Sequence, residues 1–437
     1  MRRTILMTLD GLRRDQIAPD ATPNLIAFAR HAETFADYRT VFPSCTRVVS
    51  ASIATGCFPA RHELQGNSMT LMEDGVLVPH DAGRPDFLQH KRKVTGRSLA
   101  VPTLAERLSG HGGAVIFSNV SPGAAYAHDP DGHGRVYHRA GSFAAGRIPV
   151  PASEQLLVEA NLDGDRIMTQ RFIDEVLLEQ GPALGVLWLG DPDATQHIHP
   201  LGSPEYHQAL RQSDARAQEV IEAVEQRRTA GEDILLIVGS DHGHQTVSGV
   251  IDIEQDLVAA GLKDSESSRD VVVSSNGTSA LIYVHPNVAG RIAALGQHLA
   301  RANWAGRVIS ADTLHLIGQA PHQNLAFAVS MRASDEANVH GVRGTSLVAK
   351  PAFGKPDRLG CGQHGGFGTY EQSPFLMISG GGFTPGATRM RTASVVDIAP
   401  TILAHLGVAA DGMDGAALQE CVQPSAVQGR MEKRPLA

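Results

Sequence analysis

Short apolar runs that are continuous, rather than alternating with polar residues, recur along this sequence. They are rich in Val, Ile and Leu, and Gly, Asp or Ser bounds most of them. A continuous apolar run of this length is typical of a strand that is covered on both faces. The runs are 4–10, 113–119, 184–191, 233–241, 280–285, 325–331 and 374–380.

Amphipathic stretches of helical periodicity separate these runs. Such alternation predicts an α/β fold with a doubly wound, mostly parallel sheet. The stretches are 22–32, 101–110, 165–180 and 204–228, and residues 394–408 predict a final strand, turn and helix.

A less regular, turn-rich segment interrupts the pattern and holds only two strand-like runs. We interpret this segment as an inserted, smaller α+β cap, and the end of the chain as a frayed tail. The predicted division is a core of residues 1–245 and 346–420, a cap of residues 246–345 and a tail of residues 421–437.

Composition excludes several classes of protein. With 42% hydrophobic and 19% charged residues, the 437-residue chain can bury a full core. A net charge of -8 argues against a nucleic-acid polymer as partner. Four cysteines without a regular framework argue against a disulfide scaffold.

The N-terminal apolar run is the one segment that resembles a targeting signal. Residues 5–9 are interrupted by threonine and stopped by Asp10, and no small-residue cleavage site follows. No run reaches the roughly 18 apolar residues of a membrane span. We therefore expect a first strand here, no membrane partner and a cytoplasmic protein, of an oligomeric state that the sequence does not indicate.

Acidic residues follow three of the predicted strands. Asp10 ends the first run, Asp193 follows the run 184–191, and Asp241 with His242 follows the run 233–241. Ligands of open parallel sheets bind beyond the carboxyl ends of the strands, so these side chains are expected to meet. An aspartate after one strand is explained equally well as a turn or a helix cap, but three coincide here.

Histidines accompany these aspartates. Asp193 and His197 are spaced i and i+4, which on a helical turn points both side chains the same way. Asp191 and His199 compete for these roles, although loop positions explain them more simply. Two further histidines are His244, expected to be structural, and His364, in the glycine-rich segment GCGQHGGFG.

Mixed Asp and His ligands favour zinc, with manganese or iron as alternatives. One catalytic metal needs about three protein ligands. The sequence offers twice that number, which predicts two divalent metal ions, about 3.5–4 Å apart as in phosphoryl-transfer sites. The candidate ligands are Asp10, Asp193, His197, Asp241, His242 and His364.

A nucleophile is expected in the segment 42–67, where a Phe-Pro-Ser turn precedes a predicted helix over 47–54. Thr46 lies at the start of that helix, where free N–H groups favour an anion and a metal can activate the hydroxyl. The alternatives are that Thr46 or Ser44 only caps the helix, or that Cys45 is the nucleophile. Because Asp/His-bound metals favour oxygen, we expect Cys45 to be a buried thiol.

Taken in order, these motifs resemble the alkaline phosphatase superfamily, and within it the nucleotide pyrophosphatase/phosphodiesterases and phosphonoacetate hydrolase. The resemblance implies that one metal binds Asp193, His197 and His364. It also implies that the other binds Asp10, Thr46, Asp241 and His242, and that the catalytic Asn67 holds a non-bridging phosphate oxygen. The resemblance covers residues 1–67, 184–204, 233–244 and 360–408.

The resemblance implies a two-metal hydrolase of phosphate diesters or pyrophosphates that works through a phosphothreonine. C–P bond hydrolysis of the phosphonoacetate type is the alternative, favoured by Gln196 and the segment HGGFGTYEQSPF. Against it, the stretch after the run 113–119 lacks the lysines that would bind a substrate carboxylate, unless the HKRK segment (90–93) replaces them. A phosphomonoesterase and a phosphomutase are further alternatives.

Few cationic residues lie close in sequence to Thr46, Asp193 or Asp241. A site without extra cations should prefer a phosphodiester or a phosphonate monoester to a phosphomonoester, which carries one more negative oxygen. The exceptions are Arg47 and Arg358. Arg47 and Asn276 are candidate substrate-binding residues, and the cap near 275–279 is expected to choose the leaving group.

Overall fold

The computed structural model describes residues 2–419, so the predicted tail 421–437 lies outside the described residues. Its largest sheet has ten strands in the order β21-β2-β20-β11-β1-β10-β6-β7-β8-β9. The five adjacent strands β11, β1, β10, β6 and β7 run parallel to one another. The predicted α/β fold with a mostly parallel sheet is therefore confirmed. The central strands are β1 (Arg2–Leu9), β6 (Ala114–Ser118), β7 (Arg135–Tyr137), β10 (Leu184–Leu189) and β11 (Asp233–Gly239).

The continuous apolar runs are explained by burial on both faces of this sheet. All six residues of β10 are buried, and in β1 only Arg2 is exposed. Successive side chains of a strand point to opposite faces. Accordingly, Leu6 and Val186 enter one hydrophobic core, whereas Ile5 and Leu187 enter a second one on the other face.

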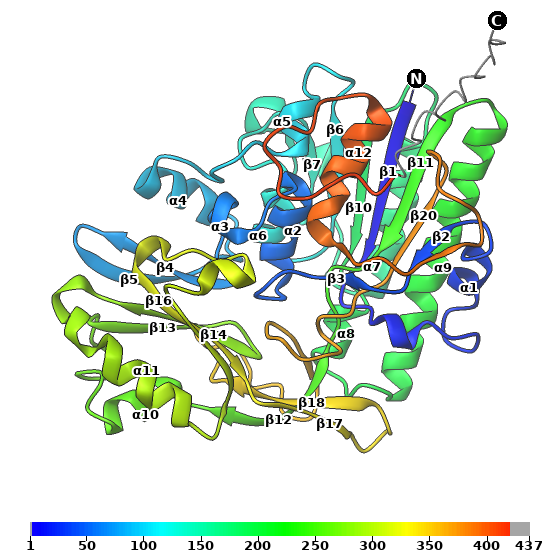
Figure 1. The fold of residues 1–437 in the computed structure, drawn as a ribbon. Coiled ribbons are helices and arrows are strands. Elements are labelled where there is room, and N and C mark those ends of the chain that lie inside the picture. Colours follow the sequence, from blue (N-terminus) through cyan, green and yellow to red (C-terminus); the bar gives the residue numbers. More distant parts are fainter. Residues whose placement is uncertain (1, 420–437) are drawn as a thin grey trace, which may run out of the picture.

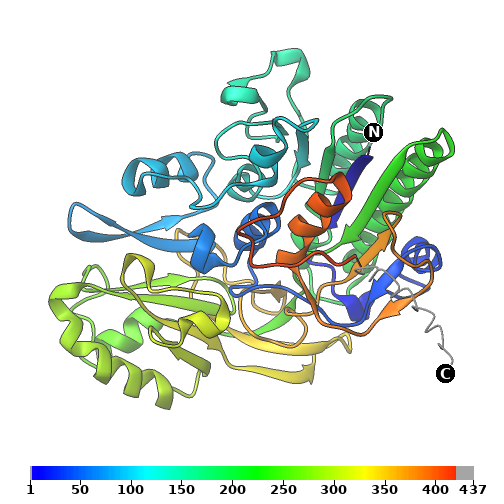
Figure 2. The same ribbon diagram turned by 45° about the horizontal axis from the view of Figure 1, so that its top comes forward.

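Helices cover both faces, as Figure 2 shows. On one face lie α2 (Thr46–Thr55), α5 (Leu104–Leu108), α6 (Pro122–Ala127) and α12 (Ile398–Leu406). On the other face lie α1 (Pro23–Phe28), α7 (Leu162–Val176) and α9 (Pro204–Thr229). The two long helices begin at side-chain caps, because Asn161 accepts from Gly164 N and Ser203 accepts from Tyr206 N.

The segment between β11 and the last core strand forms two further four-stranded sheets, in the orders β17-β18-β12-β19 and β13-β14-β16-β15. In Figure 1 these sheets lie at the bottom and the lower left, on the side toward which the carboxyl end of β1 points. Their elements are β12 (Gln245–Ile251), α10 (Ile253–Ala259), β13 (Val271–Ser275), β14 (Ser279–Val284), α11 (Ile292–Arg301), β15 (Ala305–Ser310), β16 (Leu325–Met331), β17 (Ala333–Ala337), β18 (Arg343–Ala349) and β19 (Gly362–Gln363).

The division into core and cap stays a prediction. Strand β18 lies at the boundary expected between them. This strand crosses the boundary expected between residues 345 and 346, because it pairs in parallel with β12 as far as Ala349. The sheet of the insertion therefore continues past the expected boundary.

The hairpin β4–β5 (Ser68–Glu73 and Val76–Asp81) and α4 (Phe87–Thr95) extend from the core, and both hairpin strands contact β13. The remaining helices and strands are short. They are β2 (Glu33–Phe35), β3 (Tyr38–Arg39), α3 (Pro59–His62), β8 (Phe143–Ala144), β9 (Ile148–Pro149), α8 (Asp193–Gln196), β20 (Leu376–Ser379), β21 (Thr388–Arg389) and β22 (Ala393–Ser394).

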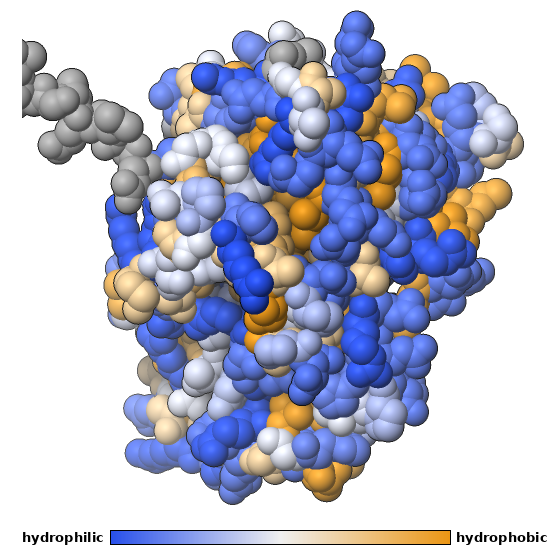
Figure 3. Space-filling view, turned by 90° about the vertical axis from the view of Figure 1, so that its right-hand side faces the viewer, coloured by the Kyte–Doolittle hydropathy of each residue, from blue (hydrophilic) through white to orange (hydrophobic). Residues whose placement is uncertain are grey.

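Hydrophilic residues cover most of the side that Figure 3 shows, the right-hand side of Figure 1, where α9 and α1 lie. None of the helices in residues 2–419 combines the length and the apolar character that crossing a membrane requires.

Candidate metal centre

Two clusters of possible ligands lie beyond the carboxyl ends of the central strands. Each holds ligand atoms within 4.8 Å of one another: Asp10, Asp241 and His242 form one, and Asp193, His197, His244 and His364 form the other. The clusters adjoin, because the rings of His242 and His364 stack with centroids 3.6 Å apart. The structure thus brings together all six residues that the sequence indicates as ligands. That they bind metal remains a prediction.

Three histidines of the centre are held by backbone carbonyl groups. The Nδ1 atoms of His197, His364 and His242 lie 2.9, 2.6 and 3.1 Å from the carbonyl oxygens of Gly362, Ser44 and Gly243. A carbonyl only accepts, so each Nδ1 must carry the proton and donate it. Each Nε2 is then an unprotonated acceptor that points into the clusters, the tautomer and orientation that a metal ligand needs.

The Nε2 atom of His242 faces two carboxylate oxygens that lack donors. Trp188 donates to Asp10 Oδ2 at 2.9 Å and Gly11 N donates to Asp241 Oδ1 at 3.0 Å. The other oxygen of each carboxylate is buried without a hydrogen-bond partner among the described residues. Those two oxygens lie 3.5 and 3.1 Å from His242 Nε2.

The pKa values follow from this crowding. Burial, and then the neighbouring carboxylates Asp241 and Asp193, raise the pKa of Asp10 well above its ordinary value. Burial, with Asp193 nearby, raises the pKa of Asp241 to about 8, and burial lowers the pKa of His242 to about 3. Several acceptor atoms thus converge on one place, and the buried carboxyl groups are difficult to ionise without a nearby positive charge. A bound divalent cation would supply that charge, so this set of donor atoms fits divalent cations.

His244 supports the second cluster. Its Nε2 lies 2.7 Å from Asp193 Oδ1, and a side chain at Gly11 would come within 2.7 Å of that nitrogen. Burial opposes ionisation of Asp193, but the hydrogen bond from His244 holds its pKa below the ordinary value. His244 therefore orients Asp193, in keeping with the structural role expected for it.

The competing residues lie outside the clusters. Asp191 Oδ1 accepts from the backbone N and the hydroxyl of Thr195, at 3.1 and 2.6 Å, which is a local turn contact. His199 lies 4.0 Å from Glu205, with 39% of its side chain exposed.

Thr46 is the first residue of α2, and its Oγ1 lies 3.1 Å from His242 Nε2. Cys45 precedes it, and burial raises the pKa of this thiol to about 12, so it is protonated at neutral pH. Ser44 donates its hydroxyl to Gly366 O and Glu371 Oε2. Of the three neighbours, only Thr46 presents its hydroxyl to the metal clusters. Asn67 adjoins this helix start, because its Oδ1 accepts from the backbone N of Arg47 at 3.3 Å.

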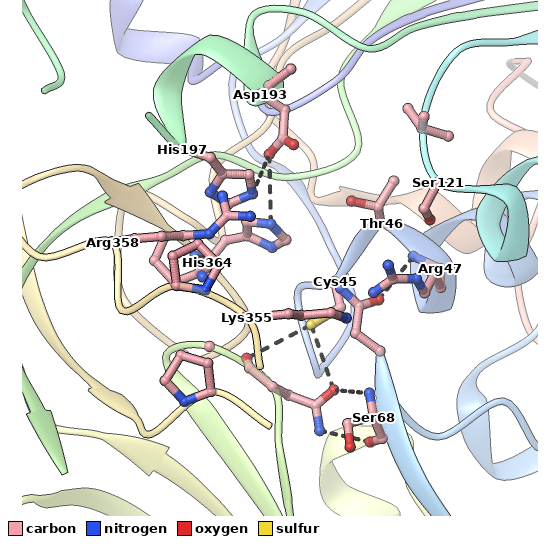
Figure 4. A pocket seen from close by; sticks show the side chains of 18 of the residues that line it. Cys45, Thr46, Arg47, Ser68, Ser121, Asp193, His197, Lys355, Arg358 and His364 are labelled. Carbon is pink, nitrogen blue, oxygen red and sulfur yellow. Dashed lines mark hydrogen bonds and ion pairs between the residues drawn. The ribbon is translucent and has the colours of Figure 1, made fainter. Parts of the chain in front are cut away.

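A cavity of about 400 Å³ opens on the centre, and Figure 4 shows Thr46, Asp193, His197 and His364 around it. Contrary to the scarcity of cations expected from the sequence, four cationic residues line it: Arg47, Arg139, Lys355 and Arg358. Arg139 was missed because it is distant in sequence from every motif. Lys355 lies nine residues before His364, but nothing in the sequence indicates that its side chain reaches the cavity. Proximity to His364 was the only signal for Arg358, and Arg139 gave none.

Two other expected substrate contacts are used differently. Asn276 lines the cavity, but its amide accepts from Ser68 N and donates to Ser68 O and Ser274 O, each at 3.0 Å. It therefore joins the insertion to the hairpin. No residue of the HKRK segment (90–93) belongs to the cavity lining.

A third group of possible ligands lies on the hairpin and α4. Glu73 Oε1 is 2.5 Å from His80 Nε2 and 3.0 Å from His90 Nε2, and none of the three residues lines the cavity. If this group binds a metal ion, that ion would add to the total metal content measured for the chain.

Comparison with known families gives one match that covers most of the chain. Residues 4–331 match the family described as type I phosphodiesterase / nucleotide pyrophosphatase. No curated protein sequence matches the chain.

Solved structures match over almost the full length. Murine ectonucleotide pyrophosphatase/phosphodiesterase 5 superposes with a TM-score of 0.67 and 17% sequence identity, covering 95% of this chain and 97% of that one. An inactive variant of the same murine protein, in complex with AMP, has the same TM-score and identity. Phosphonoacetate hydrolase from Sinorhizobium meliloti 1021, in complex with phosphonoformate, gives 0.64 and 15%, covering 93% and 95%. At these identities the likeness establishes a shared fold.

Proposed function

Since this chain belongs to the type I phosphodiesterase / nucleotide pyrophosphatase family of hydrolases, we propose that it hydrolyses small phosphodiesters or pyrophosphates through a phosphothreonine at Thr46. The observation that carries this proposal is the position of Thr46. Its hydroxyl lies 3.1 Å from His242 Nε2, at the start of α2 and beside the cluster of candidate ligands that contains Asp10, Asp241 and His242.

Two divalent metal ions are part of the proposal, and zinc suits the mixture of carboxylate and imidazole donors. Asp193, His197 and His364 would hold one ion, and Asp10, Thr46, Asp241 and His242 the other. When bound, these ions would supply Lewis-acid stabilisation of the phosphoryl oxygens and lower the pKa of the hydroxyl.

The chain's own residues then account for two displacements. In the first, Thr46 Oγ1 loses its proton and attacks phosphorus. The Oγ1–P bond forms, the bond to the leaving group breaks with its electron pair, and the leaving group takes up a proton that replaces the one released by Oγ1. In the second, a water oxygen attacks phosphorus on the opposite side, the Oγ1–P bond breaks, and Thr46 regains a proton. The net reaction adds one water across one P–O bond.

Asn67 and the start of α2 would hold the non-bridging oxygens. Because Asn67 Oδ1 accepts from Arg47 N, its Nδ2 donor is directed elsewhere and can serve a phosphate oxygen. The positive end of the α2 dipole favours the same anion.

C–P bond hydrolysis of a small phosphonate is the second candidate, and the cavity lining favours it. Lys355 and Arg358 line the same cavity as Thr46, where they could bind the carboxylate of such a substrate. They replace the lysines that the sequence lacks after the run 113–119.

Four substrates separate these functions when kcat/KM is measured on the metal-loaded protein. We expect bis(p-nitrophenyl) phosphate or p-nitrophenyl phenylphosphonate to exceed p-nitrophenyl phosphate. Phosphonoacetate as the only substrate turned over would select the second candidate. A preference for the monoester p-nitrophenyl phosphate would contradict both and indicate a phosphatase.

A further inference from the structure

We propose that the loop 350–361, together with Arg47, forms a cationic subsite that binds a second anionic group of the substrate, either a carboxylate or a second phosphoryl group. This inference rests on the proposed function, because it places the subsite beside the phosphoryl-transfer centre. It goes further by naming the charge that the rest of the substrate carries.

Two guanidinium groups at this cavity have unused donors. Arg47 Nε and Arg358 Nη1 are buried, and neither has a hydrogen-bond partner among the described residues. A buried donor without a partner is costly, and a guanidinium matches the planar geometry of carboxylate and phosphate oxygens. Both residues line the cavity, so an anion bound there would satisfy them.

The local charge is unbalanced in favour of an anion. Lys355 Nζ lies 2.8 Å from Asp81 Oδ2, and Asp81 is also the carboxylate that contributes most to stabilising the charge of Arg47, ahead of Asp193 and Asp10. Partial burial and the like charge of Arg47 lower the pKa of Lys355. The two cations therefore share Asp81 at this end of the cavity.

The backbone holds these side chains in place. Gly83 leaves the space that the Arg47 guanidinium occupies, because a Cβ at residue 83 would collide with Arg47 Nη2. In the loop, both Phe353 and Arg358 have φ of 59°, a left-handed conformation that is uncommon for bulky side chains. Such conformations persist where the surrounding structure over-determines them, often at ligand-binding sites.

The subsite adjoins the atoms that would handle the transferred phosphoryl group. In the view of Figure 4, Arg47 and Arg358 come from opposite sides of the cavity, with Lys355 between them, and Arg358 lies on the side of His197. Thr46, Asn67 and the metal ligands account for the phosphoryl oxygens. The loop cations are left for a charge elsewhere on the same small molecule.

Three p-nitrophenyl phosphodiesters that differ in one group test this subsite. The ethyl ester carries no second charge, the carboxymethyl ester adds a carboxylate, and the phosphonomethyl ester adds a second phosphoryl group. For each charged ester, kcat/KM is divided by kcat/KM for the ethyl ester. We expect Arg358→Ala to lower this ratio at least tenfold, mainly by raising KM for the charged ester. The charged ester that loses more identifies the anion. An equal loss on all three esters would overturn the subsite.

Matched controls come from cations outside the cavity. Arg84 pairs with Asp86 and is 70% exposed, and Lys93 is an exposed lysine of the HKRK segment. We expect Arg84→Ala and Lys93→Ala to leave the ratio unchanged, whereas Lys355→Ala lowers it. A ratio that changes as much in these controls would also contradict the proposal.

A binding measurement separates this subsite from the proposed reaction. In the metal-loaded Thr46→Ala protein, calorimetry should give tighter binding of phosphonoacetate than of ethylphosphonate, and adding Arg358→Ala should remove the difference. If no ester is hydrolysed but this difference is found, the proposed reaction fails and the subsite stands. If the two phosphonates bind equally in Thr46→Ala protein, the subsite is wrong whatever the enzyme hydrolyses.

Discussion

Thr46→Ala removes the one hydroxyl of the segment 44–46 that faces the metal clusters, and alanine is compatible with the first turn of α2. Removing a catalytic nucleophile commonly costs several orders of magnitude, so we expect kcat to fall at least about 1000-fold. Metal content and the unfolding midpoint should stay near those of the unsubstituted protein. The measurements are steady-state kinetics, elemental analysis and urea unfolding.

Cys45→Ala is the matched comparison, because its buried thiol has a pKa of about 12 and is not a thiolate at neutral pH. It should keep most of the activity. Loss of turnover in Cys45→Ala with retention in Thr46→Ala would show that the wrong atom had been assigned the attack.

His244→Ala removes the group that lies 2.7 Å from Asp193 Oδ1. Partners that orient a metal ligand typically contribute 10–100-fold to affinity, so we expect zinc to bind about 10–100-fold more weakly. His199→Ala, which changes an exposed histidine six residues from Asp193, should leave zinc affinity unchanged. A competition titration with a chelating dye measures both, and equal affinities in the two variants would refute the supporting role of His244.

Sequence motifs indicated the residues of the centre because each follows a predicted strand or a glycine-rich turn. Asp10, Asp193 and Asp241 needed only the rule that parallel strands end at one edge of a sheet. Trp188 Nε1, which holds Asp10, gave no such signal, because it lies within a buried strand and its role depends on which strand pairs with β1. Lys355 and Arg139 were invisible for the same reason, since a tertiary contact brings them to the cavity.

At the scale of elements, α7 carries a buried carboxyl that makes stability depend on pH. Burial, and then the nearby Asp191 carboxylate, raise the pKa of Asp165 from an ordinary 3.8 to about 7. Between those values the folded chain keeps a proton that the unfolded chain has lost. Stability from this group is therefore complete below about pH 4 and is lost as the pH rises through about 7.

Asp165→Asn should remove this pH dependence, because asparagine does not ionise. Relative to the unsubstituted protein, the free energy of unfolding of the variant should rise by up to about 1.4 kcal/mol for each pH unit between pH 4 and 7. Urea unfolding of both proteins at pH 5, 6, 7 and 8 gives the difference, in which effects common to both proteins cancel. A difference that does not change with pH would show that Asp165 is already ionised in the folded protein at pH 5.

The central strands and the long helices were predictable because burial on two faces and helical periodicity are local signals. The ends of strands β1, β10 and β11 agree with the predicted runs to within about two residues. Helix α9 (Pro204–Thr229) agrees with the predicted helix over 204–228. The insertion was less predictable. Strand β17 is exposed along its whole length, and β18 pairs with β12 across about 100 residues of chain, so neither leaves a local apolar pattern.

At the scale of the whole molecule, the two clusters predict close to two divalent ions per chain. The group of Glu73, His80 and His90 could add weakly bound metal to any measured total. His90→Ala removes a ligand atom from that group without touching the cavity, so the count should be made on this variant as well.

We expect the His90→Ala protein to hold two ions by elemental analysis after dialysis, and to lose activity when a chelator removes them. Re-addition of zinc should restore activity. An active His90→Ala preparation that holds a single ion would exclude the two-metal centre and leave one of the clusters without a cation.

The anchors of the three histidines have a further consequence for how such a protein can change over evolution. His197, His364 and His242 each depend on a main-chain oxygen, and a substitution at the residue that supplies it leaves that oxygen in place. Only a shift of the backbone path can remove an anchor. At Gly243 and Gly362 any side chain would force such a shift, because a Cβ at Gly243 would collide with Tyr370 O and one at Gly362 would come within 2.7 Å of His244 Nδ1. These two glycines are therefore constrained by the orientation of the imidazoles that they anchor, although neither supplies a ligand atom.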